Sequence, residues 1–444
     1  MSAAKKTKGR ADLRAPKRSA RRRREAPKTK KEMINYKRYQ LANGLRVLLQ
    51  EDPSSPMLTL CMNYEVGSKD ELPGRSGFAH LFEHLMFAGS LHAPNFDQLI
   101  QLAGGENNAF TNQDMTVFYD ILPYQNLDLG LWLEADRMQN LCIEPQPLQK
   151  EKRVVVEEFK ESCMEEPYGD LWHILGDLAF KEHPYKRPVI GENFEHIEAA
   201  SLEEVREFYE NYYCPNNAVL SISGNIKAEE VLERVEHWFG HIPRGAVKRP
   251  AYAAEPPQLV GRKKVHRANV TDAALYMAFP AAARLETAYY LEDLLSDILG
   301  LSDSSLLVRQ LVKQQKLFSE LDVYITGTVE AGLFVIEGKL QEGVAIEQAE
   351  QAVWAALEEF KAQPISEEQL QKLQNNTEHN LLFGEILPFQ KALSLGYYEL
   401  LGQAQLINEE ADYYQQITAK QLELQAQFLF QQEKASVLYY LPKA

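Results

Sequence analysis

Two histidines and a glutamate lie within five residues of an apolar run, "AHLFEHLMF", at residues 79–87. If the run is helical, His80 and His84 project from one face because they are four residues apart, and Glu83 lies on the same turn as His80. The neighbouring apolar side chains would bury the helix, and burying three titratable groups is costly unless something charged compensates. A metal ion would compensate, so the spacing predicts a metal site.

The motif HxxEH is the inverse of the HExxH motif of zinc peptidases. A single buried histidine is usually a core residue whose hydrogen bonds are satisfied by its neighbours. The number of HxxEH motifs expected by chance in a chain of this composition is only about 0.02, however. Catalytic zinc takes three protein ligands and leaves one position for water. Two imidazoles and one carboxylate form a familiar set, so a distant Asp or Glu is expected to complete the site.

Strand and helix patterns surround this motif. Asn43-Gly44 predicts a hairpin within residues 39–50, and residues 57–66 predict a buried strand. A loop rich in Gly, Pro and Ser, residues 67–77, precedes the HLFEH helix. Further elements predicted before residue 225 are a helix at 96–104, a strand pair at 107–122, three amphipathic helices within 127–213, and a strand at 218–224.

The pattern then restarts after a proline-rich stretch with little periodicity, which predicts a linker at 244–263. The elements predicted after it are a strand at 273–279, helices at 287–300 and 303–315, strands at 319–326 and 332–340, helices at 345–361 and 367–381, and a strand at 435–441. The expected fold class is α+β, with two homologous-looking domains of mixed sheet plus helices, residues 33–243 and 264–444.

Charge divides the chain unevenly. Residues 1–31 carry fourteen Lys and Arg and two acidic residues, leaving 34 basic and 61 acidic residues and a net charge of −27 in the remainder. We expect residues 1–32 to be a disordered basic arm. Three explanations stay open: a tether to nucleic acid or an anionic surface, a mitochondrial presequence, or translation that starts at Met33, which we favour.

Other bulk features narrow the class of protein. The acidic remainder argues against nucleic-acid binding. No apolar stretch approaches the length needed to span a membrane, so no membrane contact is expected. The four cysteines are far apart and form no CxxC pair, which indicates free thiols. With no secretory leader after either methionine, the expected compartment is the cytoplasm, with mitochondrial targeting by the arm left open.

From residue 36 onward the chain resembles the M16 (pitrilysin-like) zinc metallopeptidases of the short, two-domain type. The stretches that carry the resemblance are "HLFEH", "GGENNAFTNQDMTVFYDILP", "LEADRM", "EKRVVVEE", "HPYKRPVIG" and "YYCPNNAVLSISGN". It implies a zinc endopeptidase subunit that cuts short or unfolded peptides in an enclosed chamber.

The resemblance also implies roles for individual residues. His80, His84 and Glu158 would hold zinc, and Glu83 would be the general base that takes a proton from the attacking water. Glu151, two helical turns before Glu158, would orient a ligand from the second shell. The nearby competitor Glu157 would point about 100° away from Glu158 on the helix.

In this family an extended substrate lies along an edge strand, and the segment at 107–111 resembles it. Asn108, Ala109, Phe110 and Thr111 are the candidate substrate-binding residues. The alternative is an ordinary sheet edge beside the core.

One segment departs from the family. An Arg and a Tyr are expected in a stretch like "LVRExGLAY", but "LVKQQKLFS" has Lys313 and Ser319 at those positions. Arg309 and Tyr324 lie nearby in the wrong register. Since the family works as a clamshell of four domains and this chain has two, we expect a second M16-type subunit carrying the Arg/Tyr pair, in a heterodimer, or otherwise a homodimer. The runner-up is a non-catalytic M16-type scaffold or binding subunit.

Overall fold

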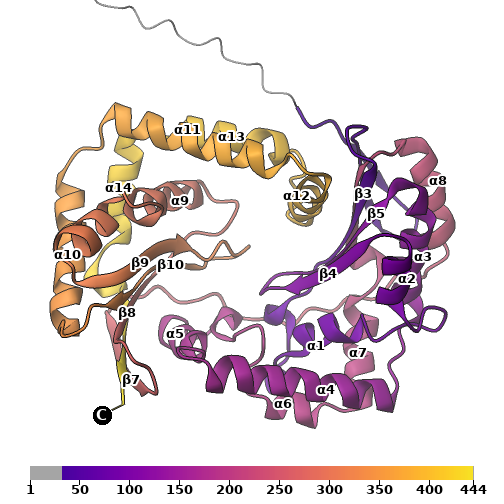
Figure 1. The fold of residues 1–444 in the computed structure, drawn as a ribbon, viewed down its shortest axis with the longest axis horizontal. Helices are drawn as coiled ribbons and strands as arrows, with labels where there is room; N and C mark the ends of the chain where they lie inside the picture. Colours follow the sequence, from indigo (N-terminus) through magenta and orange to yellow (C-terminus); the bar gives the residue numbers. More distant parts are fainter. Residues whose placement is uncertain (1–32, 444) are drawn as a thin grey trace, which may run out of the picture. The chain divides into compact units, whose positions relative to one another are not determined.

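The computed structural model describes residues 33–443, which form two mixed β-sheets with helices around them (Figure 1). The predicted basic arm, residues 1–32, lies outside the described residues. The first sheet has six strands in the order β1-β2-β6-β3-β5-β4, with β2 and β6 parallel and the other neighbours antiparallel. The strands are β1 (Lys37–Gln40), β2 (Arg46–Glu51), β3 (Met57–Tyr64), β4 (Glu106–Thr111), β5 (Thr116–Pro123) and β6 (Ala218–Gly224).

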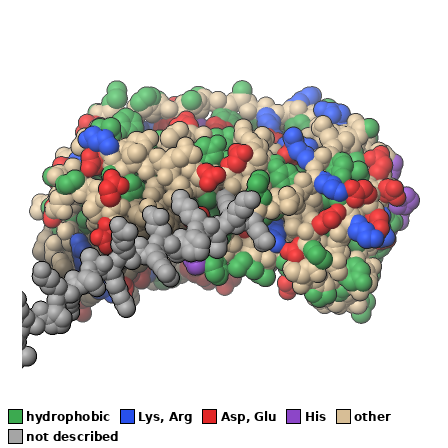
Figure 2. Space-filling view, turned by 90° about the horizontal axis from the view of Figure 1, so that it is seen from above, with side chains coloured by type: hydrophobic (Ala, Val, Ile, Leu, Met, Phe, Trp, Pro, Cys, Tyr) green, Lys and Arg blue, Asp and Glu red, His purple; other side chains and the backbone are tan. Residues whose placement is uncertain are grey.

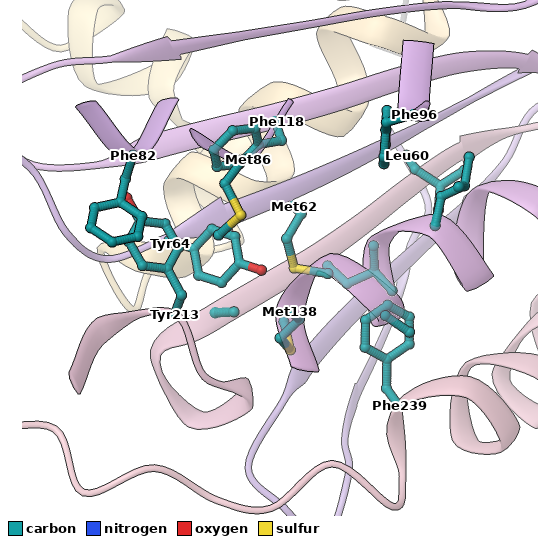
Figure 3. Close-up of a cluster of buried hydrophobic side chains, with 14 of the residues drawn as sticks. Leu60, Met62, Tyr64, Phe82, Met86, Phe96, Phe118, Met138, Tyr213 and Phe239 are labelled. Carbon is teal, nitrogen blue, oxygen red and sulfur yellow. The ribbon is translucent and has the colours of Figure 1, made fainter. Parts of the chain in front are cut away.

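One face of this sheet carries the large apolar side chains that the alternating pattern predicts. On β3, Leu60 and Met62 point into a core that also holds Phe118 of β5 and Phe239, as Figure 3 shows. The helices that bring residues to this core are α1 (Phe78–Leu85), α2 (Phe96–Leu102), α3 (Leu127–Asn140), α4 (Pro145–Phe159), α6 (Glu195–Ala199), α7 (Leu202–Tyr212) and α8 (Ala228–Phe239).

The second sheet has five strands in the order β7-β11-β8-β10-β9, with β7 and β11 parallel and the rest antiparallel. The strands are β7 (Arg262–Ala268), β8 (Ala274–Pro280), β9 (Phe318–Ile325), β10 (Leu333–Leu340) and β11 (Ser436–Pro442). A separate core covers one face of it. The helices of that core are α9 (Thr287–Gly300), α10 (Ile346–Ala362), α11 (Glu367–Gly384), α13 (Leu406–Gln415) and α14 (Ala419–Leu429).

Each sheet is covered on its other face by a helix from the opposite half of the chain. Helix α12 (Pro388–Leu400) packs on β3 and β6 of the first sheet, where Ser221 Oγ donates to the Ala392 carbonyl over 2.6 Å (Figure 1). In return, α5 (Leu171–Ala179) packs on β7, β8 and β11 of the second sheet and buries Leu175 there. Two smaller hydrophobic clusters, one under each of these helices, therefore join the two halves.

The α+β class with two domains of similar plan is confirmed, while the exact domain boundaries stay predictions. The sequence patterns assigned no element to residues 382–434, where α12, α13 and α14 form. The predicted helix at 303–315 is instead a π-helical segment, Val308–Gln314. The four cysteines are free, as predicted. Within residues 33–443 no helix combines the length and apolar character that crossing a membrane would require.

Acidic side chains are spread over the surface. On the face seen in Figure 2, Asp and Glu lie scattered among basic and hydrophobic side chains. This agrees with the net charge of −27 beyond residue 31.

Candidate metal and peptide site

Helix α1 presents its polar residues because its apolar residues are committed to the core. Phe78, Leu81 and Phe82 are at most 2% exposed, and Phe82 stacks on Tyr213 with ring centroids 5.0 Å apart. The helical period then leaves His80, Glu83 and His84 on the other side, where all three are half-buried.

The N-terminus of α1 is fixed by a buried carboxyl group. Gly77 precedes the helix at φ +86°, and a side chain there would meet the Ile190 carbonyl oxygen at 2.8 Å. The two oxygens of Glu71 accept the backbone N–H groups of Gly77 and Ala79, each over 2.9 Å. Burial raises the pKa of Glu71 to about 8, although these hydrogen bonds and the charge of Arg187 oppose the rise. Glu71 thus holds the helix that carries the motif.

Helix α4 brings the third candidate ligand. It begins with Pro145 at its first position, and its side chains Leu148, Val155 and Phe159 are buried against its neighbours. Lys152 anchors it, because its ammonium donates to the carbonyls of Glu198 and Ala200 over 2.7 and 2.8 Å. A π-helical segment, Lys160–Glu165, follows directly, and such segments are frequent at functional sites.

His80, His84 and Glu158 come together from α1 and α4. One ligand atom from each lies within 4.8 Å of the others, and this is the one such cluster of His, Cys, Asp or Glu among the described residues. His80 Nε2 lies 3.6 Å from Glu158 Oε1, and His84 Nε2 lies 3.2 Å from Glu158 Oε2. The sequence separation of 74 residues between His84 and Glu158 is closed by the packing of α1 on α4.

The pKa values of the cluster reflect burial and mutual charge. Burial lowers the pKa of His80 against the attraction of Glu158. Burial acts on His84 too, but the hydrogen bond and charge of Glu158 outweigh it and raise the pKa of His84. The hydrogen bond with His84 lowers the pKa of Glu158. The shifts favour the neutral imidazole of His80 and the carboxylate of Glu158, which are the forms that bind a cation. The raised pKa of His84 means that its ring must give up a proton when a cation binds.

The donor set fits zinc. Zinc bonds to imidazole nitrogen and carboxylate oxygen are about 2.0–2.2 Å long, so ligand atoms around a tetrahedral ion lie roughly 3.3 Å apart. The separations of 3.6 and 3.2 Å match that spacing closely. His80 Nδ1 is buried and has no hydrogen-bond partner among residues 33–443, so no group of that region orients this ring.

The other acidic candidates occupy different positions. Glu83 is half-buried on α1 and stands outside the three-residue cluster. Glu157 is exposed and pairs with Lys160 over 2.8 Å, so it points away from the cluster. Glu151 is buried and its charge acts on His84, but its carboxylate forms an ion pair with Lys150, at 3.0 Å. Its predicted bond to a ligand is absent among the described residues, and its role stays a prediction.

The candidate substrate strand lies at the edge of the first sheet. Strand β4 pairs only with β5 among the described strands, and α1 packs beside it. Asn108 is exposed and its Oδ1 accepts the Ala109 N–H over 2.8 Å, while Phe110 and Thr111 are half-buried. An exposed edge next to the cluster is a place where an extended peptide can pair.

Residues 311–319, which differ from the family pattern, contact residues of the second half through the hydrogen bonds and ion pairs of Lys313 and Ser319. Lys313 pairs with Asp303 over 3.1 Å, and Ser319 Oγ donates to the Lys339 carbonyl over 3.2 Å. Lys316 adopts φ +54°, a left-handed conformation, at the position where the family pattern has glycine. Lys316 therefore takes a backbone conformation that glycine adopts readily and other residues adopt rarely.

Sequence reasoning missed two residues beside the cluster, Glu71 and Arg187. No motif spacing relates either residue to α1. Glu71, for example, caps α1 from the loop that precedes the helix. The one local signal was that Gly77, at the N-cap position of α1, has no side chain that could accept a hydrogen bond from the first turn. The free N–H groups of that turn therefore need an acceptor from another part of the chain.

Comparisons with known proteins agree with this geometry. A family model described as Insulinase (Peptidase family M16) matches residues 46–193, and one described as Peptidase M16 inactive domain matches residues 199–377. The zinc protease PqqE of Helicobacter pylori is 29% identical over 343 residues, which cover 76% of this chain and 77% of that protein. The uncharacterized zinc protease YmxG of Bacillus subtilis is 25% identical over 410 residues, covering 90% and 97%.

Solved structures share the fold. A protease from Helicobacter pylori superposes with a TM-score of 0.88 at 24% identity, covering 93% of this chain and all of that one. The periplasmic protease PqqL from Escherichia coli gives a TM-score of 0.75 at 19% identity, and 91% of this chain covers 47% of that chain. With both halves matched by family models and HLFEH inside the first match, the chain belongs to the M16, pitrilysin-like, peptidase family.

Proposed function

We propose that this protein is a zinc-dependent endopeptidase subunit that hydrolyses short or unfolded peptides. The observation that carries the proposal is the convergence of His80, His84 and Glu158 within 4.8 Å, with Glu83 on the same helix but outside the cluster. Relatives named zinc proteases support the same chemistry.

The residues divide the work as follows. His80, His84 and Glu158 would hold zinc, which when bound supplies Lewis-acid chemistry at a carbonyl and lowers the pKa of water. Glu83 accepts the proton of the attacking water and returns it to the departing amine. Strand β4 holds the peptide extended by backbone pairing through residues Asn108 to Thr111. Glu71 keeps α1 in place while this happens, because it satisfies two N–H groups at the start of the helix.

A second subunit of M16 type would complete the chamber. This chain matches about half of PqqL, 47% of its length, so another two-domain unit has a place in the assembly. Because Lys313 and Ser319 stand where the family has Arg and Tyr, we favour a different chain that carries this pair, with a second copy of this chain as the alternative.

The competing function is a non-catalytic scaffold or binding subunit. Two observations favour it: residues 199–377 match the inactive-domain model, and Ser319 is too short to replace a phenol that donates to an oxyanion. The retained HLFEH motif and Glu158 weigh against it.

The test is a metal and activity measurement on the purified chain. We expect one zinc per chain and slow cleavage of extended peptides that a chelator abolishes and added zinc restores. Light scattering gives the assembly, and co-purification from the native source identifies any second subunit. A metal-free chain without hydrolysis, even with its native partner, would favour the scaffold function.

A further inference from the structure

A pocket of about 490 Å³ lies where both halves of the chain meet. Its walls include Trp172 of α5 and Val189 and Ile190 from the first half, and Tyr324 and Ile325 of β9 from the second. Clefts of this size with apolar walls and a few polar groups are typical ligand sites.

Three neighbours place the pocket beside the site already described. Ile190 lies against Gly77, the residue before α1, since its carbonyl oxygen is 2.8 Å from where a Gly77 side chain would begin. Gln113 of the pocket follows β4 by two residues. Cys163 of the pocket follows Glu158 by five residues. A peptide on β4 therefore has a pocket near the end of that strand.

The pocket contains a buried arginine with an unsatisfied hydrogen-bond donor. Arg187 lines it and is 8% exposed, and its Nε–H is buried without a hydrogen-bond partner among the described residues. The nearby carboxyl of Glu71 has both oxygens occupied by the N–H groups of Gly77 and Ala79. A buried donor without an acceptor is costly, which suggests that its acceptor is a ligand.

The rest of the lining does not supply an anion. Among the described residues that line the pocket none is Asp or Glu, although the chain beyond residue 31 has a net charge of −27. Asp114 and Glu337 accept hydrogen bonds from the lining residues Tyr185 and Tyr324, but they do not line the pocket themselves. The pocket is thus a locally cationic spot with apolar walls.

The pocket is also preformed, because a buried polar network joins its two sides. Asp114 accepts from the hydroxyl of Tyr185 at 2.6 Å and from the backbone N–H of Val329 at 2.9 Å. Glu330 accepts from Tyr252 at 2.5 Å and contacts His183 Nε2 at 3.0 Å. These bonds hold the turn after β9 against the first half, so the pocket costs little to organise when a ligand binds.

We infer that this pocket binds a carboxylate of the peptide substrate at Arg187, with an apolar side chain of the same peptide against Trp172. The inference rests on the proposed peptidase function, since it names the substrates of that site. The carboxylate comes from one of two sources, the C-terminus of a short peptide or an Asp or Glu side chain. An Arg–carboxylate contact is charge-assisted and directional, and burial strengthens it.

The experiment measures binding separately from hydrolysis. The full-length Glu83→Gln chain, loaded with zinc, is titrated with short peptides ending in Phe, either as the free acid or as the amide. Of the four tryptophans, Trp172 alone lines the pocket, so its fluorescence reports occupancy and the signal should vanish in Trp172→Phe. We expect the acid to bind about tenfold or more tightly than the amide.

Two further arms identify the source and the residue. Among amidated peptides, tighter binding of an internal Glu than of Gln would assign the side chain as the source. Arg187→Met should remove the preference for carboxylate, and Arg187→Lys should keep part of it. Arg234→Met is the matched control, since Arg234 pairs with Asp128 at 2.7 Å away from the pocket, and it should change nothing.

The outcomes separate this inference from the proposed function. Equal binding of all acid and amide forms by the parent chain overturns the inference, as does an unchanged preference in Arg187→Met. Carboxylate-dependent binding, with no hydrolysis by the wild-type chain even in the presence of its native partner, keeps the pocket and refutes the peptidase. Hydrolysis without any preference for a carboxylate supports the peptidase function and refutes the carboxylate pocket.

Discussion

The two halves of the chain have one plan and different chemistry. Strands β2, β6, β3, β5 and β4 of the first sheet correspond in order and direction to β7, β11, β8, β10 and β9 of the second. In each half a helix follows the central strand, namely α1 after β3 and α9 after β8.

The corresponding helices differ in what they bury. On α1 one face is apolar, and the other carries His80, Glu83 and His84 in half-exposed positions. On α9 both faces are committed, because Leu294 and Leu295 are buried and the carboxyl of Glu292 accepts from Ala282 N and Gln425 Nε2, each over 2.7 Å. The comparison teaches that the fold supplies the position and that one free helix face supplies the chemistry.

The largest expected effect comes from removing a metal ligand in the first half. His80→Ala, His84→Ala or Glu158→Gln should each reduce bound zinc from one per chain to near zero, because a three-ligand site tolerates poorly the loss of one ligand. Glu83→Gln should keep the metal and lower hydrolysis by about 10²–10⁴-fold. Metal analysis and peptide cleavage check both. His379→Ala in the second half is the control, and full zinc in the His80 and His84 variants would refute the assignment.

A second test uses the buried acid of α9. Burial raises the pKa of Glu292 from 4.5 to about 7, so the folded chain holds a proton that the unfolded chain loses between those values. Stability from this group is complete below pH 4.5 and is lost as the pH rises to about 7. Glu292→Gln should flatten this window and be more stable at pH 8, on the order of 3 kcal/mol. Urea unfolding at several pH values measures it, and parallel curves would contradict the prediction.

A third test weakens the helix that the second half lends to the first sheet. A side chain at Gly396 of α12 would overlap the Asn63 amide on β3, so Gly396→Ala should cost about 1–3 kcal/mol of stability. Gly384→Ala is the matched control, because nothing lies within 4 Å of that position. If both variants unfold at the same urea concentration, α12 is not seated as described.

The smallest effect should come from the basic arm. A chain that begins at Met33 is expected to fold and keep its metal, since residues 1–31 contain no apolar face to dock. Thermal unfolding and zinc content check this, and a drop of many degrees in Tm would show that the arm contributes.

Features that depend on residues close together in the sequence could be predicted from it, and features that depend on distant residues could not. Period and spacing are local, so they predicted the α1 motif, the hairpin at Gly44 and the strand pair β4–β5. Glu158 required a family resemblance, because nothing local ties it to a helix 74 residues earlier. The positions of Glu71 and Arg187 could not be predicted, since each contacts α1 or its surroundings only through tertiary packing.

Helices α5 and α12, which each pack on the sheet of the other half, could not be placed from the sequence either. An amphipathic pattern predicts a helix with a buried face but does not say which sheet buries it. The second face of the first sheet carries the polar residues Thr59, Asn63 and Ser221, yet all three are buried, and α12 packs on the two strands that carry them. Polar residues on a covered face gave no hydrophobic signal to detect.

The crossing of α12 has a consequence for how the protein is made. The first sheet is complete in sequence once β6 ends at Gly224, but its cover begins only at Pro388. At typical rates of synthesis the ribosome needs roughly 10–30 s to make the intervening residues. During that time Leu48 and Val219, which the finished protein buries under α12, lack this cover. Slowing translation between these two points should therefore increase misfolding, whereas the same delay after Leu400 should be harmless.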